Sequence, residues 1–340
     1  MSDYAKLAEA ALDAVAQAAS VCREVQAGIA DVRAITKDDR SPVTVADFAA
    51  QAIVARILTE SLGPILLVGE EDSKFLRDPE HQSHLDATVA AVRGVWPEAD
   101  EKAVLDAVDI GSADTHHDGY WTLDPVDGTK GFLRNQQYAI ALAYVERGQP
   151  VVGVMGCPNL PRDFSAPLDT PDAHGSLYVC IKGDGVMELP CDEPGAERVT
   201  IKRLPHEENE EVSVCASVEK AHSNVTSTDR ILERLTADGI KVGHPVRLDS
   251  QAKYAVVARG QADAYLRMPT RADYVERIWD HAAGSLVASE AGCFVTDIFG
   301  NALDFSHGRG LEKNKGVIAA PPRIHGLVIA AIQELGVGQP

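Results

Sequence analysis

WTLDPVDGTKGF, residues 121–132, joins a short apolar strand to a segment rich in turn-forming residues. Asp, Pro and Gly favour turns for distinct backbone reasons, so the strand is expected to end near Asp124. Downstream, apolar strand-like runs recur between Gly and Pro turns, at 138–145, 151–155, 177–181 and 186–189. This pattern predicts an antiparallel sheet that begins at Trp121.

Upstream of this sheet the pattern changes to helices. Apolar residues between Leu7 and Ile29 recur at steps of three and four, which is the spacing of one helical face. Residues 41–58 have the same helical period, and Ile65–Val68 forms a short apolar run that Gly69 stops. The first half is therefore expected to be an α+β domain, with helices packed on an antiparallel sheet.

The second half has a different organisation. Residues 190–211 are polar, charged and proline-containing, which makes them the best candidate for a boundary between domains. Beyond them, strand-like and helix-like segments alternate to the end of the chain, and this alternation favours an α/β arrangement. We therefore expect an α+β domain over 1–195 and an α/β domain over 196–340.

Composition limits the possible functions. The chain has 340 residues and a formal net charge of −19, which argues against binding nucleic acid polymers, because such binding relies on Lys and Arg. No apolar run reaches the roughly 20 residues that span a bilayer, so no membrane partner is expected. The N-terminal segment lacks a targeting pattern, and the six cysteines are scattered without a CxxC pair. Reduced, buried thiols and a cytoplasmic location are the expectation.

Two interpretations of Asp124 and Asp127 stay open. The DxxDG pattern is most often a plain β-turn. The same geometry could bring two carboxylates and an intervening carbonyl onto one cation, and all-oxygen ligands suit Mg²⁺. Thr129 would then lie where exposed backbone N–H groups favour a phosphate.

Other acids strengthen the second interpretation without deciding it. Glu70, or with less support Glu71, ends a strand, and Asp280 lies among apolar residues, where a buried carboxylate needs a partner. A solvated strand end and a helix cap are the alternatives. Asp47 follows Thr44 by three residues, so it is either a capping-box acid or a general base or metal ligand acting on a water.

Cationic residues in the second half could recognise a second anionic group. Ser250 and Lys253 lie three residues apart, on one helical face, and could grip a phosphate. An N-cap serine beside a solvated lysine is the alternative. Arg267 ends an apolar strand, where a fork-shaped cation suits phosphate or stacking on a base.

Taken in order, a set of motifs resembles the 3'(2'),5'-bisphosphate nucleotidases. These belong to the lithium-sensitive, Mg²⁺-dependent phosphatases that include inositol monophosphatase and fructose bisphosphatase. The motifs extend over nearly the whole chain and are SPVTVAD, GEED, WTLDPVDGTKGFLR, CPNLP, SVEKAHSN, LDSQAKY, ADAYLRMP and IWDHAAG. The resemblance implies a layered αβαβα sandwich and two or three Mg²⁺ ions.

The resemblance also implies residue roles. The metal ligands would be Glu70, Asp124, the Val126 carbonyl, Asp127 and Asp280. Asp47 and Thr129 would activate the attacking water. The substrate would contact Thr129, His222, Ser250, Lys253, Arg267 and Asp280.

The resulting hypothesis is an enzyme that removes the 3'-phosphate of 3'-phosphoadenosine 5'-phosphate to give AMP. Phosphoadenylyl sulfate is a further expected substrate, and the protein is expected to act as a monomer. One rival is an inositol phosphate phosphatase, which would share the metal ligands but need no adenosine pocket. Another rival is a catalytically silent sensor that binds the nucleotide without cleaving it. No P-loop or dinucleotide fingerprint supports a kinase or a dehydrogenase.

Overall fold

The computed structural model describes residues 3–28, 35–36, 42–43, 45–208, 210–218, 225–269, 271 and 273–338. Two long helices come first, α1 (Asp3–Ala27) and α2 (Val45–Leu62), and between them β1 (Ile35–Thr36) pairs antiparallel with β2 (Pro42–Val43). The buried residues of α1 recur at helical spacing, and many of them are alanines. Small side chains let α1 and α2 pack closely on each other.

A seven-stranded sheet forms the centre of the first half. Its order is β3-β4-β5-β6-β7-β8-β9. The strands are β3 (Leu67–Gly69), β4 (Gly119–Asp127), β5 (Ala139–Glu146), β6 (Gln149–Cys157), β7 (Ser176–Ile181), β8 (Gly185–Pro190) and β9 (Val199–Ile201). Every neighbouring pair is antiparallel except β3 and β4, which are parallel. The predicted antiparallel sheet is thus present, with one parallel strand at its edge.

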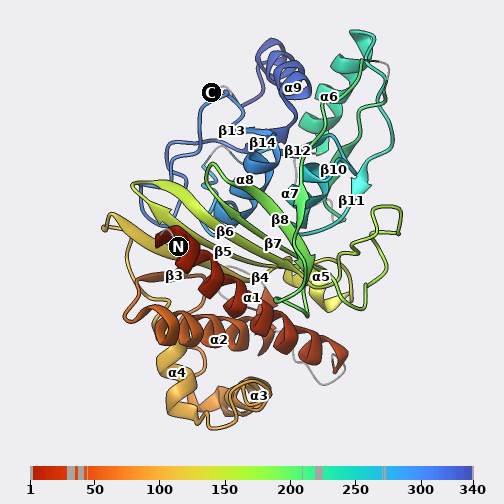
Figure 1. Cartoon of the computed structure of the whole chain (residues 1–340). Helices are drawn as coiled ribbons and strands as arrows, with labels where there is room; N and C mark the ends of the chain where they lie inside the picture. The colour runs from red at the N-terminus through yellow and green to blue at the C-terminus, as the bar shows by residue number, and fades with distance from the viewer. Residues whose placement is uncertain are drawn as a thin grey trace.

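The excursion between β3 and β4 is helical. It contains the 3-10 helix η1 (Pro79–His81), α3 (Gln82–Val92) and α4 (Glu101–Asp109), and its buried apolar residues join the same core as α1 and α2. Asp100 caps α4 by accepting a hydrogen bond from the Ala103 N–H at 2.7 Å. These helices cover α2 on the side away from the sheet (Figure 1).

A second, five-stranded sheet has the order β11-β10-β12-β14-β13. Its strands are β10 (Val214–Ala216), β11 (Val246–Arg247), β12 (Ala264–Arg267), β13 (Phe294–Thr296) and β14 (Val317–Ala320). The pairs β10–β11 and β10–β12 are parallel, whereas β12–β14 and β13–β14 are antiparallel. The helices of this half are α6 (Val225–Ala237), α7 (Ala252–Ala258), α8 (Ala282–Ala291) and α9 (Pro322–Leu335).

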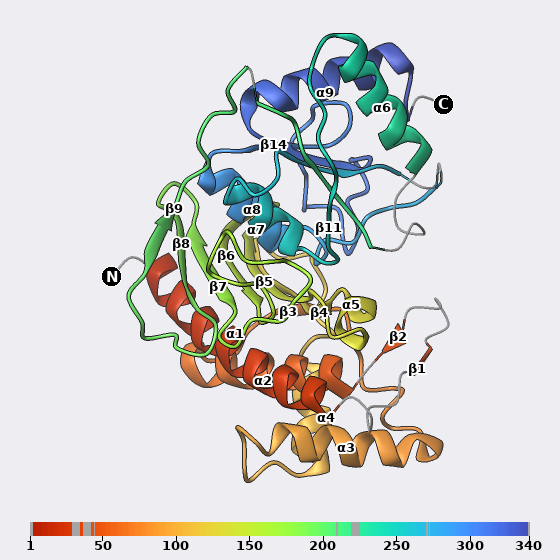
Figure 2. The ribbon, with the colours of Figure 1, turned by 90° about the vertical axis from the view of Figure 1, so that its right-hand side faces the viewer.

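The elements stack in five layers. Helices α1 and α2 cover one face of the large sheet, and α7 and α8 lie between its other face and the small sheet (Figures 1 and 2). Helices α6 and α9 cover the far side of the small sheet. This is the layered αβαβα sandwich that the sequence resemblance implied, so the predicted fold class is confirmed.

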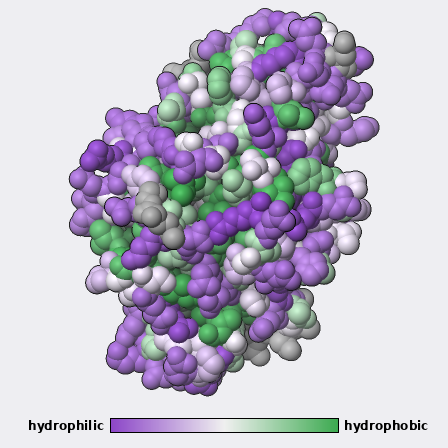
Figure 3. Space-filling view, in the orientation of Figure 1, coloured by the Kyte–Doolittle hydropathy of each residue, from purple (hydrophilic) through white to green (hydrophobic). Residues whose placement is uncertain are grey.

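The polypeptide leaves the large sheet at β9 and enters the small one at β10, in the region where we expected a boundary. The proposed division at residue 195 stays a prediction. All six cysteines are buried and free, as expected. Hydrophilic side chains cover most of the face drawn in Figure 3, with apolar areas between them. No helix among the described residues is long and apolar enough to cross a membrane.

Candidate active site

An irregularity at the end of β4 places Asp124 and Asp127 on one face of the sheet. Asp124 pairs with Ala141 of β5 and Asp127 pairs with Ala139, so three residue steps on β4 match two on β5. In a regular strand, residues three apart point to opposite faces, and one extra residue restores the same side. Ala139 and Ala141 belong to the core shared with α7 and α8. Both aspartates therefore face the layer that contains Asp280.

The turn after Asp127 depends on Gly128. Its φ of 87° is in the left-handed region, and a Cβ at this position would lie 2.8 Å from the Cβ of Ser250. Helix α5 (Thr129–Leu133) starts immediately afterwards, and the Thr129 hydroxyl donates a hydrogen bond to the Val126 carbonyl at 3.2 Å. The DPVDGT segment is therefore both a turn and the place where several oxygen atoms gather.

Glu70 lies beside Asp124 because β3 runs parallel to β4. Gly69 is opposite Leu123, and the Glu70 N–H donates to the Leu123 carbonyl at 3.1 Å. The charge of Glu70 raises the pKa of both Asp124 and Asp280. Glu71 is buried, and its backbone bonds to the side chain of Gln51. Of the two predicted alternatives, Glu70 is the one with a resolved effect on these aspartates.

The acidic side chains of this site act on one another electrostatically. Burial raises the pKa of Asp124 well above its usual range, and the charges of the other acids raise it further, in the order Glu70, Asp127, Asp280 and Asp47. Burial likewise raises the pKa of Asp280, helped by Asp127 and opposed by Arg267. So many carboxylates in one place are unstable unless they are protonated or bound to a cation.

Asp124 also carries an unpaired atom. Its Oδ1 is buried and has no hydrogen-bond partner among the residues that the structure describes. A buried acceptor without a partner is costly, and a metal ion would satisfy it. An all-oxygen set of carboxylates and a nearby backbone carbonyl matches the preference of Mg²⁺. The residues present thus fit a magnesium centre.

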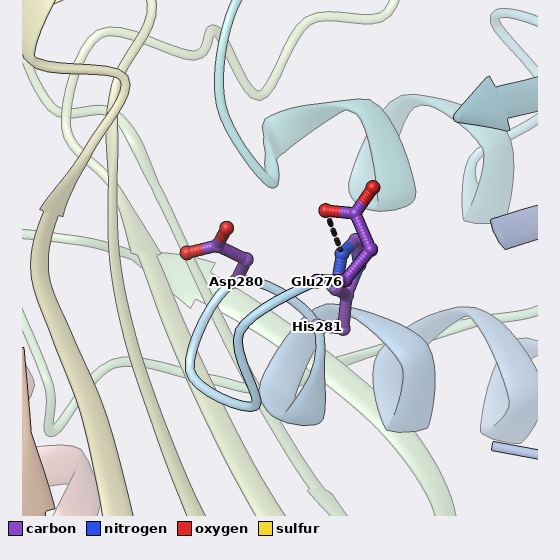
Figure 4. Close-up of side chains that lie close together, drawn as sticks. All are labelled: Glu276, Asp280 and His281. Carbon is purple, nitrogen blue, oxygen red and sulfur yellow. Dashed lines mark hydrogen bonds and ion pairs between the residues drawn. The ribbon is translucent and has the colours of Figure 1, made fainter. Parts of the chain in front are cut away.

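A second cluster of possible ligands lies next to Asp280. Ligand atoms of Glu276, Asp280 and His281 are within 4.8 Å of one another. In Figure 4, however, the Asp280 carboxylate points away from the other two side chains, which bond to each other. Burial alone would raise the pKa of Glu276, but Arg267 and His281 outweigh it and lower the pKa to about 2. Glu276 therefore acts as the partner of Arg267, and only Asp280 is directed toward the acidic site.

Three predicted substrate residues of the second half, Ser250, Lys253 and Arg267, lie near the turn that carries Asp127. Ser250 has a φ of 69°, and its Oγ accepts a hydrogen bond from the Ala252 N–H at 3.2 Å. The buried Lys253 ammonium donates to the Ser250 carbonyl at 3.1 Å and lies 5.3 Å from the centre of the Tyr265 ring. Burial lowers the pKa of Lys253, opposed by Asp127. The predicted residue His222, and Thr44, the suggested capping partner of Asp47, lie outside the described residues.

Three further residues organise the site and were missed by the sequence analysis. The Gln251 N–H donates to Asp127, while its buried side chain donates to the Trp279 carbonyl at 2.8 Å and accepts from the Gly284 N–H at 3.0 Å. Glu276 and His281 are the other two. The sequence signal was weak: Gln251 and His281 are adjacent to predicted site residues and Glu276 is four residues before Asp280, and such proximity is common in surface segments.

Comparisons with known proteins identify the family of the chain and several of its relatives. Residues 3–336 match the inositol monophosphatase family. A relative from Schizosaccharomyces pombe, a 3'(2'),5'-bisphosphate nucleotidase, is 43% identical over 88% of this chain and 85% of its own length. A relative of the same name from Oryza sativa is 38% identical, with coverages of 97% and 94%.

Solved structures are similar in fold. Mycobacterium tuberculosis SuhB aligns with a TM-score of 0.63 at 20% identity, and the alignment covers 100% of both chains. An inositol monophosphatase/NADP phosphatase complexed with Mg²⁺ and phosphate aligns with a TM-score of 0.59 at 19% identity, over 92% of this chain and 90% of the other. At these identities the alignments support the layered sandwich and not a particular substrate.

Proposed function

The chain belongs to the inositol monophosphatase family, and on this premise we propose that it is a Mg²⁺-dependent 3'(2'),5'-bisphosphate nucleotidase. It would remove the 3'-phosphate of 3'-phosphoadenosine 5'-phosphate to give AMP and phosphate, and would also act on phosphoadenylyl sulfate. The observation that carries this proposal is that one aspartate, Asp127, is subject both to burial beside the acidic group and to the positive charges of Lys253 and Arg267. Asp127 would thus lie between a metal site and a second site that binds an anion.

Two or three Mg²⁺ ions would be held by Glu70, Asp124, the Val126 carbonyl, Asp127 and Asp280. When bound, Mg²⁺ lowers the pKa of a coordinated water and neutralises the phosphate oxygens. The Thr129 hydroxyl donates a hydrogen bond to the Val126 carbonyl, which leaves its oxygen lone pairs to accept a hydrogen bond from the attacking water and so orient it. Asp47, which is buried and whose charge acts on Asp124, would serve as the base that takes the proton of the attacking water.

The second half of the site would hold the nucleotide. Ser250, Lys253 and Arg267 would contact the 5'-phosphate and ribose, and His222 would line the same pocket. Lys253 is almost fully buried, so a phosphate bound beside it would be desolvated, and a charge-assisted contact is strong under that condition. The relatives named as bisphosphate nucleotidases, at 36–43% identity, support this substrate class.

The test compares phosphate release from the adenosine bisphosphate and from inositol phosphates at one Mg²⁺ concentration. We expect efficient turnover of the nucleotide, and Lys253→Ala and Arg267→Ala should reduce its kcat/KM by at least tenfold more than that of an inositol phosphate. Equal losses on both substrates would favour an inositol phosphate phosphatase. Purified protein that releases no phosphate from the nucleotide with Mg²⁺ present would overturn the proposal.

A silent nucleotide sensor is tested separately with Asp47→Ala. If Asp47 is the base, this variant should lose turnover while magnesium still raises its thermal stability as in the wild type. A sensor would show no turnover in either protein. The predictions of a monomer and of a cytoplasmic location accompany this proposal, and sedimentation and localisation of the tagged chain would check them.

A further inference from the structure

Glu276 lies in the interior of the site and binds two different groups. The residue is 3% exposed. Arg267 approaches it with both ends of the guanidinium, Nε to Oε1 at 3.1 Å and Nη2 to Oε2 at 3.1 Å. On the other side, His281 Nε2 lies 3.3 Å from Oε2. The carboxylate is therefore held between a cation and a ring.

The ring is fixed in turn. His281 is 1% exposed, and its Nδ1 lies 2.8 Å from the hydroxyl of the fully buried Tyr254 of α7. The Glu276 carbonyl also accepts a hydrogen bond from the Leu311 N–H at 2.8 Å, which fixes the backbone of the acid. Tyr254, His281 and Glu276 thus form a chain of buried contacts that ends at Arg267.

This arrangement determines how Arg267 can meet a ligand. A guanidinium has five N–H donors in a rigid fork, and a bidentate pair uses the edge formed by Nε and one terminal nitrogen. With that edge on Glu276, the donors left to Arg267 are those of Nη1 and the second one of Nη2, and the Tyr274 hydroxyl is also in hydrogen-bond contact with this side chain. An arginine with a flexible stem would otherwise lose considerable rotamer freedom when it binds an anion.

We infer that Glu276 is a positioning residue that holds Arg267 ready for the non-reacting phosphate of the substrate. The inference rests on the proposed function and adds to it a residue that does not touch the substrate. Glu276 would act on binding of the bisphosphate, and the bond-breaking step at the acidic site would depend on it much less. Its contact with His281 provides the competing explanation, in which Glu276 merely supports the Asp280 turn.

The test is Glu276→Gln in the full chain, with steady-state kinetics on the adenosine bisphosphate. We expect KM to rise about tenfold, the effect of weakening one charge-assisted pair, with a much smaller change in kcat. The inhibition constant of the product AMP, which keeps the 5'-phosphate, should rise by a similar factor. That of inorganic phosphate, which binds the acidic site, should change by less than about twofold.

A double-mutant cycle separates positioning from support. If Glu276 acts through Arg267, then Glu276→Gln should add almost nothing to the loss caused by Arg267→Ala. Glu290→Gln is the matched control, because Glu290 accepts from the N–H groups of Gly183 and Gly185 at 2.9 and 3.0 Å on another part of the fold. This control should have wild-type KM.

Several outcomes would overturn the inference. A fall in kcat together with a higher Mg²⁺ requirement would mean that Glu276 supports Asp280, and additive losses in the cycle would mean that it acts independently of Arg267. If Glu276→Gln does not fold, Glu276→Asp provides the test, because the shorter side chain keeps the charge but cannot reach both Arg267 nitrogens and should also raise KM. Failure of the wild type to cleave the nucleotide would instead reject the proposed function, and this inference with it.

Discussion

At the scale of single residues, Gly128 shows why the DPVDGT turn tolerates little change. Gly128→Ala would add a Cβ at a φ of 87°, only 2.8 Å from the Ser250 Cβ. We expect a loss of about 1–3 kcal/mol in unfolding free energy from the backbone strain and the clash. Because Ser250 would be displaced, KM for the nucleotide should also rise. Chemical denaturation and steady-state kinetics would measure both effects.

The control is Gly183→Ala, since Gly183 also has a positive φ, of 91°, but a Cβ there would meet nothing within 4 Å. It should lose stability from strain alone and keep the wild-type KM. If Gly128→Ala and Gly183→Ala gave the same unfolding free energy and the same KM, the close approach of Gly128 to Ser250 would not contribute to substrate binding.

Residue identities at the site were largely predictable, whereas their electrostatic states were not. The acids stand in recognisable motifs, and the structure places Glu70, Asp124, Asp127, Asp280 and Asp47 within electrostatic reach of one another. Their roles as ligands and base stay predictions. The choice of Glu70 over Glu71 depends on the register of β3 against β4, a long-range property that local sequence patterns do not contain.

At the scale of elements, α1, α2 and most strands of the large sheet followed from periodicity, whereas α3, α4 and β9 were not predicted. Two decisive features did not follow from it either. The first is the parallel pairing of β3 with β4, which requires the long helical segment between them. The second is the irregularity between Asp124 and Asp127, which arises from how β4 pairs with β5. A strand sequence alone does not reveal an extra residue in the ladder, because the partner strand defines it.

Gln251 connects three elements, and its replacement tests that connection. In Gln251→Leu, the Trp279 carbonyl and the Gly284 N–H would each lose a buried partner. We expect a loss of about 2–6 kcal/mol in unfolding free energy, since each of the two unsatisfied groups costs about 1–3 kcal/mol. The turn that carries Asp280 should also shift relative to Asp127. A higher Mg²⁺ concentration for half-maximal activity is therefore expected.

Gln26→Leu is the matched control for this prediction. Gln26 is also buried, and its side chain also makes two hydrogen bonds, to the Phe132 carbonyl and from Asn159. It should lose comparable stability without a change in Mg²⁺ requirement. Equal changes in both variants would mean that Gln251 contributes only to general stability.

At the scale of the whole molecule, the acidic site opposes folding when no metal is bound. The chain already carries a formal net charge of −19, and its carboxylates converge between the two sheets. The carboxylates repel one another when no metal is bound, and a bound cation relieves this repulsion. Metal binding therefore stabilises the folded chain. Sequence composition predicted the overall charge, but the concentration of charge at one point arises only when distant segments meet.

The pH dependence of stability therefore provides a final prediction. The pKa values of Asp124 and Asp280 are raised in the folded, metal-free chain, so above about pH 4 the native state holds more protons than the unfolded state. By linkage, these groups favour folding at low pH, and their contribution is lost as the pH rises through the raised pKa values. In EDTA, the part of the stability that these two groups control should fall as the pH rises from 5 to 8.

Magnesium should reverse this trend, because its ligands bind in the deprotonated form. At a Mg²⁺ concentration about 100 times the dissociation constant, stabilisation of about 2.7 kcal/mol is expected, and the increase in Tm should be larger at pH 8 than at pH 5. Thermal unfolding with EDTA or Mg²⁺ at both pH values measures the difference. Asp124→Asn, which removes the central charge, should be more stable than the wild type in EDTA at pH 8 and respond weakly to Mg²⁺. An equal Mg²⁺ response in both proteins would contradict the assignment of Asp124 to the metal centre.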